Sequence, residues 1–259
     1  MSQDLTVFVT GASAGFGAAI ARRFAKDGAR LVLTARRLDK LQALQAELGG
    51  PSRAHAVALD VTDRAAVERV FANLPKDFAA IDVLVNNAGL ARGLDPAQKA
   101  SLDDWDQMVD TNVKGLMYCS RTVLPGMIER RRGHIVNLGS TAGTYPYPGG
   151  NVYCSTKAFV HQFTLTLRAD LLGTPVRMTS IEAGLCGGTE FSEIRFHGDQ
   201  EKAAGVYAGT QPIMPEDIAE TVHWVATLPA HVNINVVEVM PVCQAFGPLA
   251  VSRAQAPNR

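Results

Sequence analysis

The chain has 259 residues, of which 47% are apolar and 19% are charged. This proportion of apolar residues is enough to bury a core, and it excludes a disordered or fibrous protein. The 25 basic residues balance the 25 acidic ones, so the sequence offers no broad basic face for nucleic acid.

Short aliphatic and β-branched runs alternate with longer segments of helical periodicity along the chain. The runs predict strands at residues 5–9, 30–34, 55–59, 83–85, 134–138, 176–181 and 235–240. The periodic segments predict helices at residues 18–24, 38–48, 65–74, 102–130, 152–171 and 215–227. In the fourth of these helices, Ser101 and Asp104 suit a capping box, Pro125 should bend or break the helix, and Gly133 suits its end.

This alternation predicts an α/β fold. Strands that are apolar on both faces and alternate with helices form a parallel sheet that is covered on both sides. With right-handed crossovers, the seven runs make a Rossmann-like, doubly wound, seven-stranded parallel sheet. No linker rich in Pro, Gly or Ser divides the chain, so we expect residues 1–259 to form a single domain.

One stretch, residues 185–214, interrupts the alternation. It is rich in glycine and contains only brief helical patterns. Long connections in compact α/β domains are often lids or binding loops, so we expect a substrate-binding lid here. A variable surface loop is the alternative interpretation.

A glycine-rich turn joins the first expected strand to the first expected helix. Gly11, Gly15 and Gly17 have the spacing G-x-x-x-G-x-G, which differs from the commonest dinucleotide fingerprint. Glycines at a helix N-terminus allow a pyrophosphate to approach the backbone N–H groups. The turn therefore predicts dinucleotide binding, and a purely structural turn is the alternative.

The end of the second strand indicates which dinucleotide is bound. NAD-binding units carry an acidic residue roughly 20 positions after the glycines, whereas this chain has Arg36 and Arg37 there and no acid before Asp39. Two guanidinium groups suit a 2′-phosphate in charge and geometry. The pair predicts NADP(H) rather than NAD(H), unless both arginines simply point into solvent.

Three residues of the second half suit a proton-transfer site. Tyr153 and Lys157 are four positions apart in a helical pattern and share one face. An ammonium group nearby can lower the pKa of a tyrosine from about 10 toward neutrality. Ser140 follows the fifth strand, at the edge where doubly wound sheets bind ligands, and can hydrogen-bond a carbonyl oxygen. Each signal alone is weak, because such residues also recur in ordinary helices and turns.

Together these motifs resemble the short-chain dehydrogenase/reductase family over essentially the full chain. The resemblance rests on residues 10–17, Asp60-Val61, residues 86–89, Asn112, and the Ser140, Tyr153 and Lys157 set. It implies a catalytic set of Ser140, Tyr153, Lys157 and Asn112, in which Asn112 positions a water beside Lys157. It further implies cofactor contacts from Gly11, Ser13, Gly15, Phe16, Gly17, Arg36, Arg37, Asp60, Val61, Asn87, Ala88, Gly89, Tyr153, Lys157, Gly184 and Thr189.

A narrower resemblance covers residues 140–153, 187–195 and 228–235. These segments are similar to the NADP-dependent 3-hydroxy acid (serine) dehydrogenases, which oxidise serine and other 3-hydroxy acids, reduce semialdehydes and are usually homotetramers. The similarity implies substrate contacts from Ser140, Tyr153 and Arg195.

Two positions depart from these patterns. Ala183 stands where the family nearly always has proline before Gly184, which should loosen the segment. Arg92 stands where the subgroup is expected to have a small apolar residue. It either contacts a substrate carboxylate or points into water.

The sequence therefore predicts an NADP(H)-dependent dehydrogenase of small 3-hydroxy acids or semialdehydes. A broad carbonyl reductase acting on ketones or β-keto esters is the alternative enzyme, and a non-catalytic NADP(H) sensor is the alternative outside that class. We expect a small-molecule alcohol or carbonyl substrate, a homotetramer, and neither nucleic-acid, membrane nor metal partners. The absence of a signal-type or membrane-spanning run and the dispersed Cys119, Cys154, Cys186 and Cys243 predict a cytoplasmic protein with reduced, core-packed thiols.

Overall fold

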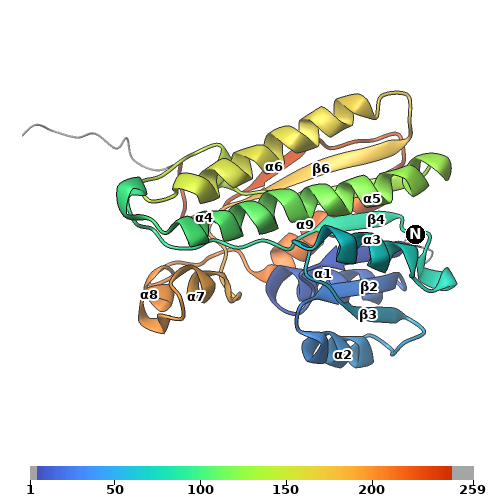
Figure 1. Ribbon diagram of the computed structural model, residues 1–259, viewed down its shortest axis with the longest axis horizontal. Helices are drawn as coiled ribbons and strands as arrows, with labels where there is room; N and C mark the ends of the chain where they lie inside the picture. The colour runs from blue at the N-terminus through green and yellow to red at the C-terminus, as the bar shows by residue number, and fades with distance from the viewer. Residues whose placement is uncertain (1–4, 247–259) are drawn as a thin grey trace, which may run out of the picture.

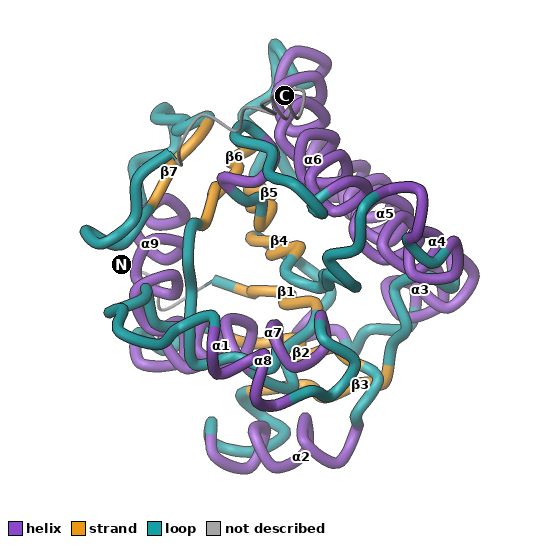
Figure 2. The backbone as a smooth tube through the Cα atoms, turned by 90° about the vertical axis from the view of Figure 1, so that its left-hand side faces the viewer, coloured by secondary structure: helices purple, strands orange, loops and turns teal. Residues whose placement is uncertain are grey.

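The predicted aliphatic runs all form strands of one parallel sheet. The computed structural model describes residues 5–246. The strands are β1 (Thr6–Thr10), β2 (Arg30–Ala35), β3 (Ala54–Ala58), β4 (Val83–Asn86), β5 (Gly133–Leu138), β6 (Val176–Ala183) and β7 (Val236–Val239). Their order is β3-β2-β1-β4-β5-β6-β7, so the direction of winding reverses between β1 and β4 (Figures 1 and 2). Doubly wound sheets bind ligands at this reversal point.

Helices cover both faces of the sheet. They are α1 (Gly15–Lys26), α2 (Leu38–Glu47), α3 (Arg64–Ala72), α4 (Leu102–Val109), α5 (Leu116–Glu129), α6 (Asn151–Asp170), α7 (Phe191–Arg195), α8 (Gln200–Gly205) and α9 (Pro215–Thr227). Helices α1, α2 and α9 pack on one face and α3, α5 and α6 on the other (Figure 2). The predicted α/β, doubly wound, seven-stranded fold is confirmed.

Alternation along the central strand explains why both faces are covered. Val7 and Val9 of β1 belong to the core beneath α1 and α9, whereas Phe8 belongs to the opposite core, where it stacks on Phe71 of α3 at 4.5 Å between ring centroids. Successive strand residues point to opposite faces. Because both sets are apolar and fully buried, neither face of the strand is left in water.

The segment 102–130 differs from the single helix that its periodicity predicts. Ser101 does cap α4, since its side chain accepts a hydrogen bond from the Asp104 N–H. The interruption comes at a six-residue π-helical turn, Asp110–Gly115, and Pro125 lies inside α5 without ending it. Gly133 does not end the helix either. It begins β5, packed so closely on Met127 that a Cβ would collide with that side chain.

A buried chain of amides and hydroxyls ties the sheet to α5 and α6. Asn86 of β4 donates to Asn137 of β5 at 2.8 Å and to Ser120 of α5 at 2.9 Å. Asn137 in turn donates to Thr164 of α6 at 2.8 Å. Buried polar groups of this kind are costly unless they are paired, so the chain fixes the register between β4, β5 and both helices.

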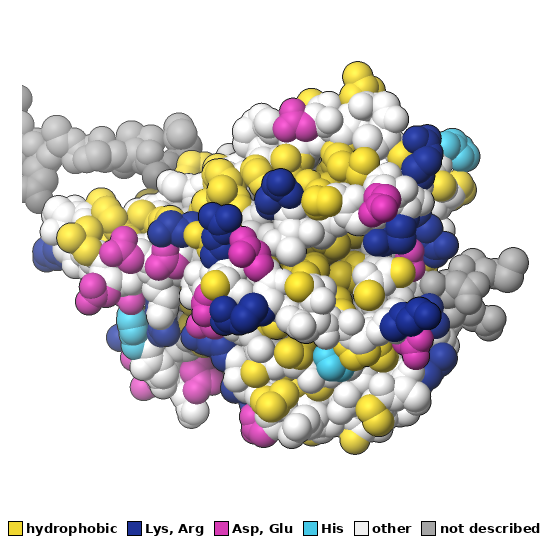
Figure 3. All heavy atoms as spheres, turned by 45° about the vertical axis from the view of Figure 1, so that its right-hand side comes forward, with side chains coloured by type: hydrophobic (Ala, Val, Ile, Leu, Met, Phe, Trp, Pro, Cys, Tyr) yellow, Lys and Arg dark blue, Asp and Glu magenta, His cyan; other side chains and the backbone are white. Residues whose placement is uncertain are grey.

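The connection 185–214 lies at the carboxyl edge of the sheet. It contains α7 and α8, which sit together beyond the strand ends (Figure 1). Charged side chains of both signs intermingle on the face drawn in Figure 3. None of the helices within residues 5–246 is long and apolar enough to cross a membrane.

The cysteines are free thiols in different surroundings. Cys119 and Cys154 are buried and Cys186 is half-buried, but Cys243 is exposed. The expectation that every cysteine packs in the core is therefore wrong for Cys243.

Candidate active site

The glycine-rich turn after β1 has the geometry of an anion site. Gly11 and Gly15 have positive φ angles of 66° and 51°, which favour glycine. Gly17 lies so close to the backbone of Gly11 that no Cβ could fit there. The first turn of α1 carries no acidic side chain and has no side-chain cap. Its N–H groups therefore remain available to a phosphate group.

Asn87 holds this turn in place from the end of β4. Its side-chain amide donates to the carbonyl oxygens of Thr10 at 2.8 Å and Gly11 at 3.2 Å. The Thr10 hydroxyl accepts from the backbone N–H groups of Asn87 and Ala88 in return, at 3.0 and 2.9 Å. The β1 turn and the segment Asn87–Gly89 are thus one unit.

Two hollows meet at the turn and together make an elongated site. The outer one, of about 840 Å³, is lined by Arg36, Arg37, Asp60 and Val61. The inner one, of about 400 Å³, is lined by Ser140, Tyr153 and Lys157 and by parts of α7. Both share the floor Gly11, Ser13, Ala88 and Gly89. A dinucleotide with phosphates at its centre fits this shape and these donors.

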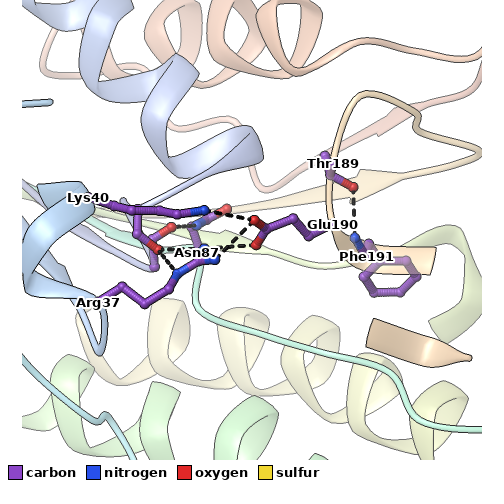
Figure 4. A network of polar contacts seen from close by, with 8 residues as sticks. Arg37, Lys40, Asn87, Thr189, Glu190 and Phe191 are labelled. Carbon is purple, nitrogen blue, oxygen red and sulfur yellow. Dashed lines mark hydrogen bonds and ion pairs between the residues drawn. The ribbon is translucent and has the colours of Figure 1, made fainter. Parts of the chain in front are cut away.

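Arg37 is held from two sides at the mouth of the outer hollow. Its Nε and Nη2 donate to the Ser13 hydroxyl at 3.3 and 3.0 Å, and its Nη1 and Nη2 donate to the Glu190 carboxylate at 3.0 and 2.8 Å. Lys40 joins Glu190 at 3.2 Å (Figure 4). These bonds lower the pKa of Glu190 and raise that of Arg37. Arg36 is exposed, with no side-chain partner within residues 5–246.

Ser140, Tyr153 and Lys157 converge on the inner hollow, and each is at least 92% buried. The Ser140 hydroxyl donates to the Ala183 carbonyl at 3.2 Å, accepts from the Ala142 N–H at 3.1 Å, and is hydrogen-bonded to Tyr153. The Lys157 ammonium donates to the Leu138 carbonyl at 2.8 Å and lies 5.9 Å from the centre of the Tyr153 ring.

Burial moves the pKa values of Tyr153 and Lys157 in opposite directions. It raises the pKa of Tyr153, against the charge of Arg195 and the hydrogen bond of Ser140, which is the opposite of the lowering by Lys157 that the sequence predicts. It lowers the pKa of Lys157 to about 8, against the charge of Glu182. At neutral pH the tyrosine therefore holds its proton and most of the lysine is still charged. The pair can donate a proton to a developing alkoxide.

Glu182 is a buried carboxylate that the sequence prediction missed. Its side chain accepts from the Ser140 N–H at 2.7 Å and from the Ser180 hydroxyl at 2.5 Å, and the imidazole of His161 lies 3.2 Å away. Gly139 leaves it room, because a Cβ there would overlap the carboxylate. The sequence signal that could have revealed Glu182 is an acidic residue between Ile181 and Ala183, at the end of an expected strand. A buried charge without a partner is costly, so an acid at such a position indicates a specific role.

Asn112 lies behind the inner hollow, in the π-helical turn. Its amide donates to the Leu90 carbonyl at 2.8 Å and to the Thr156 hydroxyl at 3.1 Å, and its oxygen accepts from the Leu90 N–H at 2.9 Å. Asn112 thus anchors the segment after β4 to α6. Its partner on α6, Thr156, is the residue before Lys157. π-Helical turns inside helices are frequent at functional sites.

The two candidate arginines lie in different places. Arg195 lines the inner hollow, with its guanidinium 4.9 Å from the Tyr153 ring centre and 5.0 Å from that of Phe191. Arg92 does not point into water. It lines the outer hollow, and it donates to the Gln107 side chain at 2.7 Å and to the Ile194 carbonyl at 2.8 Å. These bonds tie α4 to α7, and its contact with a substrate carboxylate stays a prediction.

The segment that begins at Ala183 and Gly184 is hydrogen-bonded to β7. Ala183 is the last residue of β6, paired with Val239 of β7, and Gly184 donates to the Val239 carbonyl at 2.8 Å. Thr189, further along, lies against the glycine turn at Gly15. Gly184 and Thr189 both line the inner hollow.

Comparison with known proteins agrees with this geometry. The family model for short chain dehydrogenases matches residues 5–199, and the chain belongs to that family of oxidoreductases. It is 61% identical over 250 residues to the NADP-dependent 3-hydroxy acid dehydrogenase YdfG of Salmonella typhi, across 96% of this chain and 100% of the relative. It is 52% identical over 248 residues to a serine 3-dehydrogenase of Rhizobium radiobacter, across 96% and 98%.

One solved structure is similar to this chain over nearly its whole length. The closed form of a serine dehydrogenase complexed with NADP+ superposes with a TM-score of 0.94 at 57% identity, over 96% of this chain and 99% of that one. The family resemblance drawn from the sequence motifs is confirmed. Within residues 5–246, no group of three or more His, Cys, Asp or Glu side chains is arranged to hold a metal ion.

The burial of Lys157 should cost folding stability, which Lys157→Met tests. The pKa of about 8 lies below the roughly 10.4 of an unfolded lysine, so the penalty is on the order of 3 kcal/mol at about 1.4 kcal/mol per pKa unit. The lost hydrogen bond to Leu138 offsets only about 1 kcal/mol of that. We expect the Met variant to have the higher Tm at pH 7.

The pH dependence of folding stability tests the direction of this effect. Between pH 8 and about 10.4 the unfolded wild-type chain binds more protons than the folded one, so wild-type stability rises with pH there. The advantage of the Met variant should shrink over that range in thermal unfolding followed by circular dichroism. Lys99→Met, at an exposed position, is the control. A Met variant that is less stable throughout contradicts the expected penalty.

Proposed function

We propose that this chain is an NADP(H)-dependent dehydrogenase of small 3-hydroxy acids such as serine or 3-hydroxypropanoate, and a reductase of the matching semialdehydes. The relatives at 52% and 61% identity carry names of that activity. The observation that carries the substrate class in this chain is the unsatisfied guanidinium of Arg195 inside the catalytic hollow.

Arg195 has the surroundings of a carboxylate ligand. Its Nη2 donates to the Tyr147 hydroxyl at 2.8 Å, but its Nε is buried and has no hydrogen-bond partner within residues 5–246. Glu182, the buried acid nearest the chemistry, is already bonded to Ser140 and Ser180. A buried donor without a partner, such as this Nε, is costly by itself, and a substrate carboxylate would supply both the negative charge and the acceptor.

The cofactor contacts follow from the two hollows. The pyrophosphate would lie on the turn of Gly11, Ser13, Gly15, Phe16 and Gly17, and the adenosine side on Arg36, Arg37, Asp60 and Val61. The nicotinamide side would contact Asn87, Ala88, Gly89, Tyr153, Lys157, Gly184 and Thr189. When bound, the nicotinamide supplies or accepts the hydride.

The protein's own groups handle the proton and the orientation. Tyr153 donates the proton to the substrate oxygen in reduction and removes it in oxidation. Ser140 holds that oxygen through its hydroxyl, and Lys157 keeps a positive charge beside the ring and binds the ribose. Asn112 positions a water that links Lys157 to solvent. Arg195 orients the acid, and Arg92 supports α7.

Residues 185–214 are proposed to act as the lid of this site, in a single-domain, cytoplasmic homotetramer. Six lid residues from Thr189 to Arg195 line the inner hollow, so closing or opening this segment controls access to Tyr153. For the assembly, α6 offers Phe159 and Phe163, stacked at 5.3 Å and only partly buried. No nucleic-acid or membrane partner is part of the proposal.

The substrate class is tested by Arg195→Ala against a panel of L-serine, 3-hydroxypropanoate, 3-hydroxyisobutyrate and neutral ketones with NADP(H). A charged hydrogen bond is worth about 1.5–3 kcal/mol, so KM for the acids should rise by more than about tenfold. KM for a ketone of similar size should barely change.

Tyr153→Phe should bind cofactor but turn over none of the panel.

Three outcomes contradict this assignment. Equal losses for acids and ketones would make Arg195 structural. A selective loss in Arg92→Ala alone would move the carboxylate site to the outer hollow. Better turnover of neutral ketones throughout would favour a broad carbonyl reductase.

Cofactor choice is tested by replacing Arg36 and Arg37 with alanine. Each charged contact to a phosphate contributes roughly 1.5–3 kcal/mol, so KM for NADPH should rise more than about tenfold relative to KM for NADH. Initial rates with both cofactors measure this ratio. An equal loss with NADPH and NADH would mean that the arginines do not bind the 2′-phosphate.

Glu182 gives a prediction about pH. Its negative charge raises the pKa of Lys157 against the effect of burial, so Glu182→Gln should lower that pKa further. The alkaline decline of kcat should then move to lower pH, while an amide of the same shape can still accept from the Ser140 N–H. The pH profile of kcat measures the shift, and an unchanged alkaline limb with reduced kcat would leave Glu182 a purely structural role.

A further inference from the structure

We propose that Glu190 is a positioning residue for cofactor selection: it orients Arg37 toward the 2′-phosphate and thereby couples that phosphate to the closing of the lid. The inference rests on the proposed use of NADP(H). It concerns a carboxylate to which neither the motif analysis nor the proposed catalytic set assigns a role.

The contacts of Arg37 divide its guanidinium into two edges. Glu190 takes the end edge with both oxygens, through Nη1 at 3.0 Å and Nη2 at 2.8 Å. The side edge, formed by Nε and Nη2, is thereby turned toward the Ser13 hydroxyl at the glycine turn. Bidentate pairs fix the plane of a guanidinium. A phosphate that binds at Ser13 therefore meets an arginine edge that is already aimed at it.

The local charges favour keeping Glu190 in place when a phosphate binds. Arg36, Arg37 and Lys40 carry three positive charges, and Glu190 carries one negative charge. A phosphate monoester adds about −1.5 to −2 at neutral pH, which brings the cluster close to neutrality. Without the phosphate, these four side chains keep an excess of two positive charges, of which the neighbouring Asp39 offsets one.

Glu190 belongs to the lid, which makes the contact a coupling between two sites. It is the residue immediately before α7, and α7 ends at Arg195 in the catalytic hollow. Beside it, Thr189 lies against Gly15 of the phosphate-binding turn. In Figure 4 the Glu190 side chain reaches from the lid to Arg37 and Lys40, which come from the start of α2.

The coupling between lid closure and binding of the 2′-phosphate is reciprocal. If the closed lid improves the affinity for the 2′-phosphate, the 2′-phosphate stabilises the closed lid by the same factor. NADP(H) would thus close the lid over Arg195 and Tyr153 more fully than NAD(H). Selectivity for the phosphorylated cofactor would then appear in substrate binding as well as in cofactor binding.

The test uses two probes that differ only in the phosphate, adenosine 2′,5′-bisphosphate and AMP, titrated calorimetrically into the full chain. Glu190→Gln should weaken the bisphosphate by roughly three- to tenfold, the scale of about 1 kcal/mol for one orienting ion pair. The affinity for AMP should not change. Glu201→Gln, which removes an exposed lid charge on α8, is the matched control and should alter neither.

A second measurement follows the lid itself by hydrogen–deuterium exchange of residues 186–207. In the wild type, NADP+ should protect this segment more than NAD+ does, and in Glu190→Gln the difference should disappear. Unchanged bisphosphate affinity, tighter bisphosphate binding, or equal weakening of both probes in Glu190→Gln would each overturn the inference. A wild-type chain that does not prefer the bisphosphate over AMP would instead refute the proposed NADP(H) dependence.

Discussion

The hydrogen bond between Asn86 and Asn137 is the contact on which the geometry of the site depends. The two amides are paired in register on β4 and β5, and each reaches out to a different helix, α5 through Ser120 and α6 through Thr164. Ser140 follows β5, while Tyr153 and Lys157 lie on α6. A slip of either strand would leave buried amides unpaired. The same bonds therefore hold the serine and the tyrosine together.

Burial gives this site its electrostatic character. Lys157 and Glu182 are both almost fully buried. The charge of Glu182 offsets only part of the cost of burying the Lys157 ammonium, because the pKa of Lys157 still falls below its usual value. Arg195 adds a second cation against the Tyr153 ring. A low local dielectric strengthens each of these charges toward a bound substrate. The inner hollow is therefore lined by more cationic than anionic side chains, inside a protein whose overall charge is balanced.

The fold was predictable because the local hydrophobic periodicity of the sequence distinguishes its strands from its helices. Runs such as residues 5–9 and 83–85 are apolar on both faces, and only a covered parallel sheet accommodates them. Pro125 and Gly133 misled the prediction because their effects depend on packing: α5 continues through the proline, and Gly133 is needed for contact with Met127 rather than for a helix end. The π-helical turn at 110–115 has no signature in the hydrophobic pattern.

The site was predictable only where a motif has fixed local spacing. Tyr153 and Lys157 are one helical turn apart, so sequence alone brings them together. Glu182 and Glu190 act on partners 42 and 153 positions away, and no local pattern could pair them. Arg92 shows the same limit in reverse. Its unusual position in the sequence suggested a ligand contact, but tertiary packing had already supplied partners in Gln107 and Ile194.

The size of the inner hollow bears on metabolism as well as on chemistry. About 400 Å³ must hold the reacting end of the cofactor and the substrate together, and Tyr147, Val206 and Tyr207 form part of its wall. Under the proposed function, a short acid would span the distance between Arg195 and Tyr153, whereas a longer acyl chain would need room beside these side chains. Length would then separate acids of three or four carbons from longer acids with the same functional groups, before any hydrogen bond is formed.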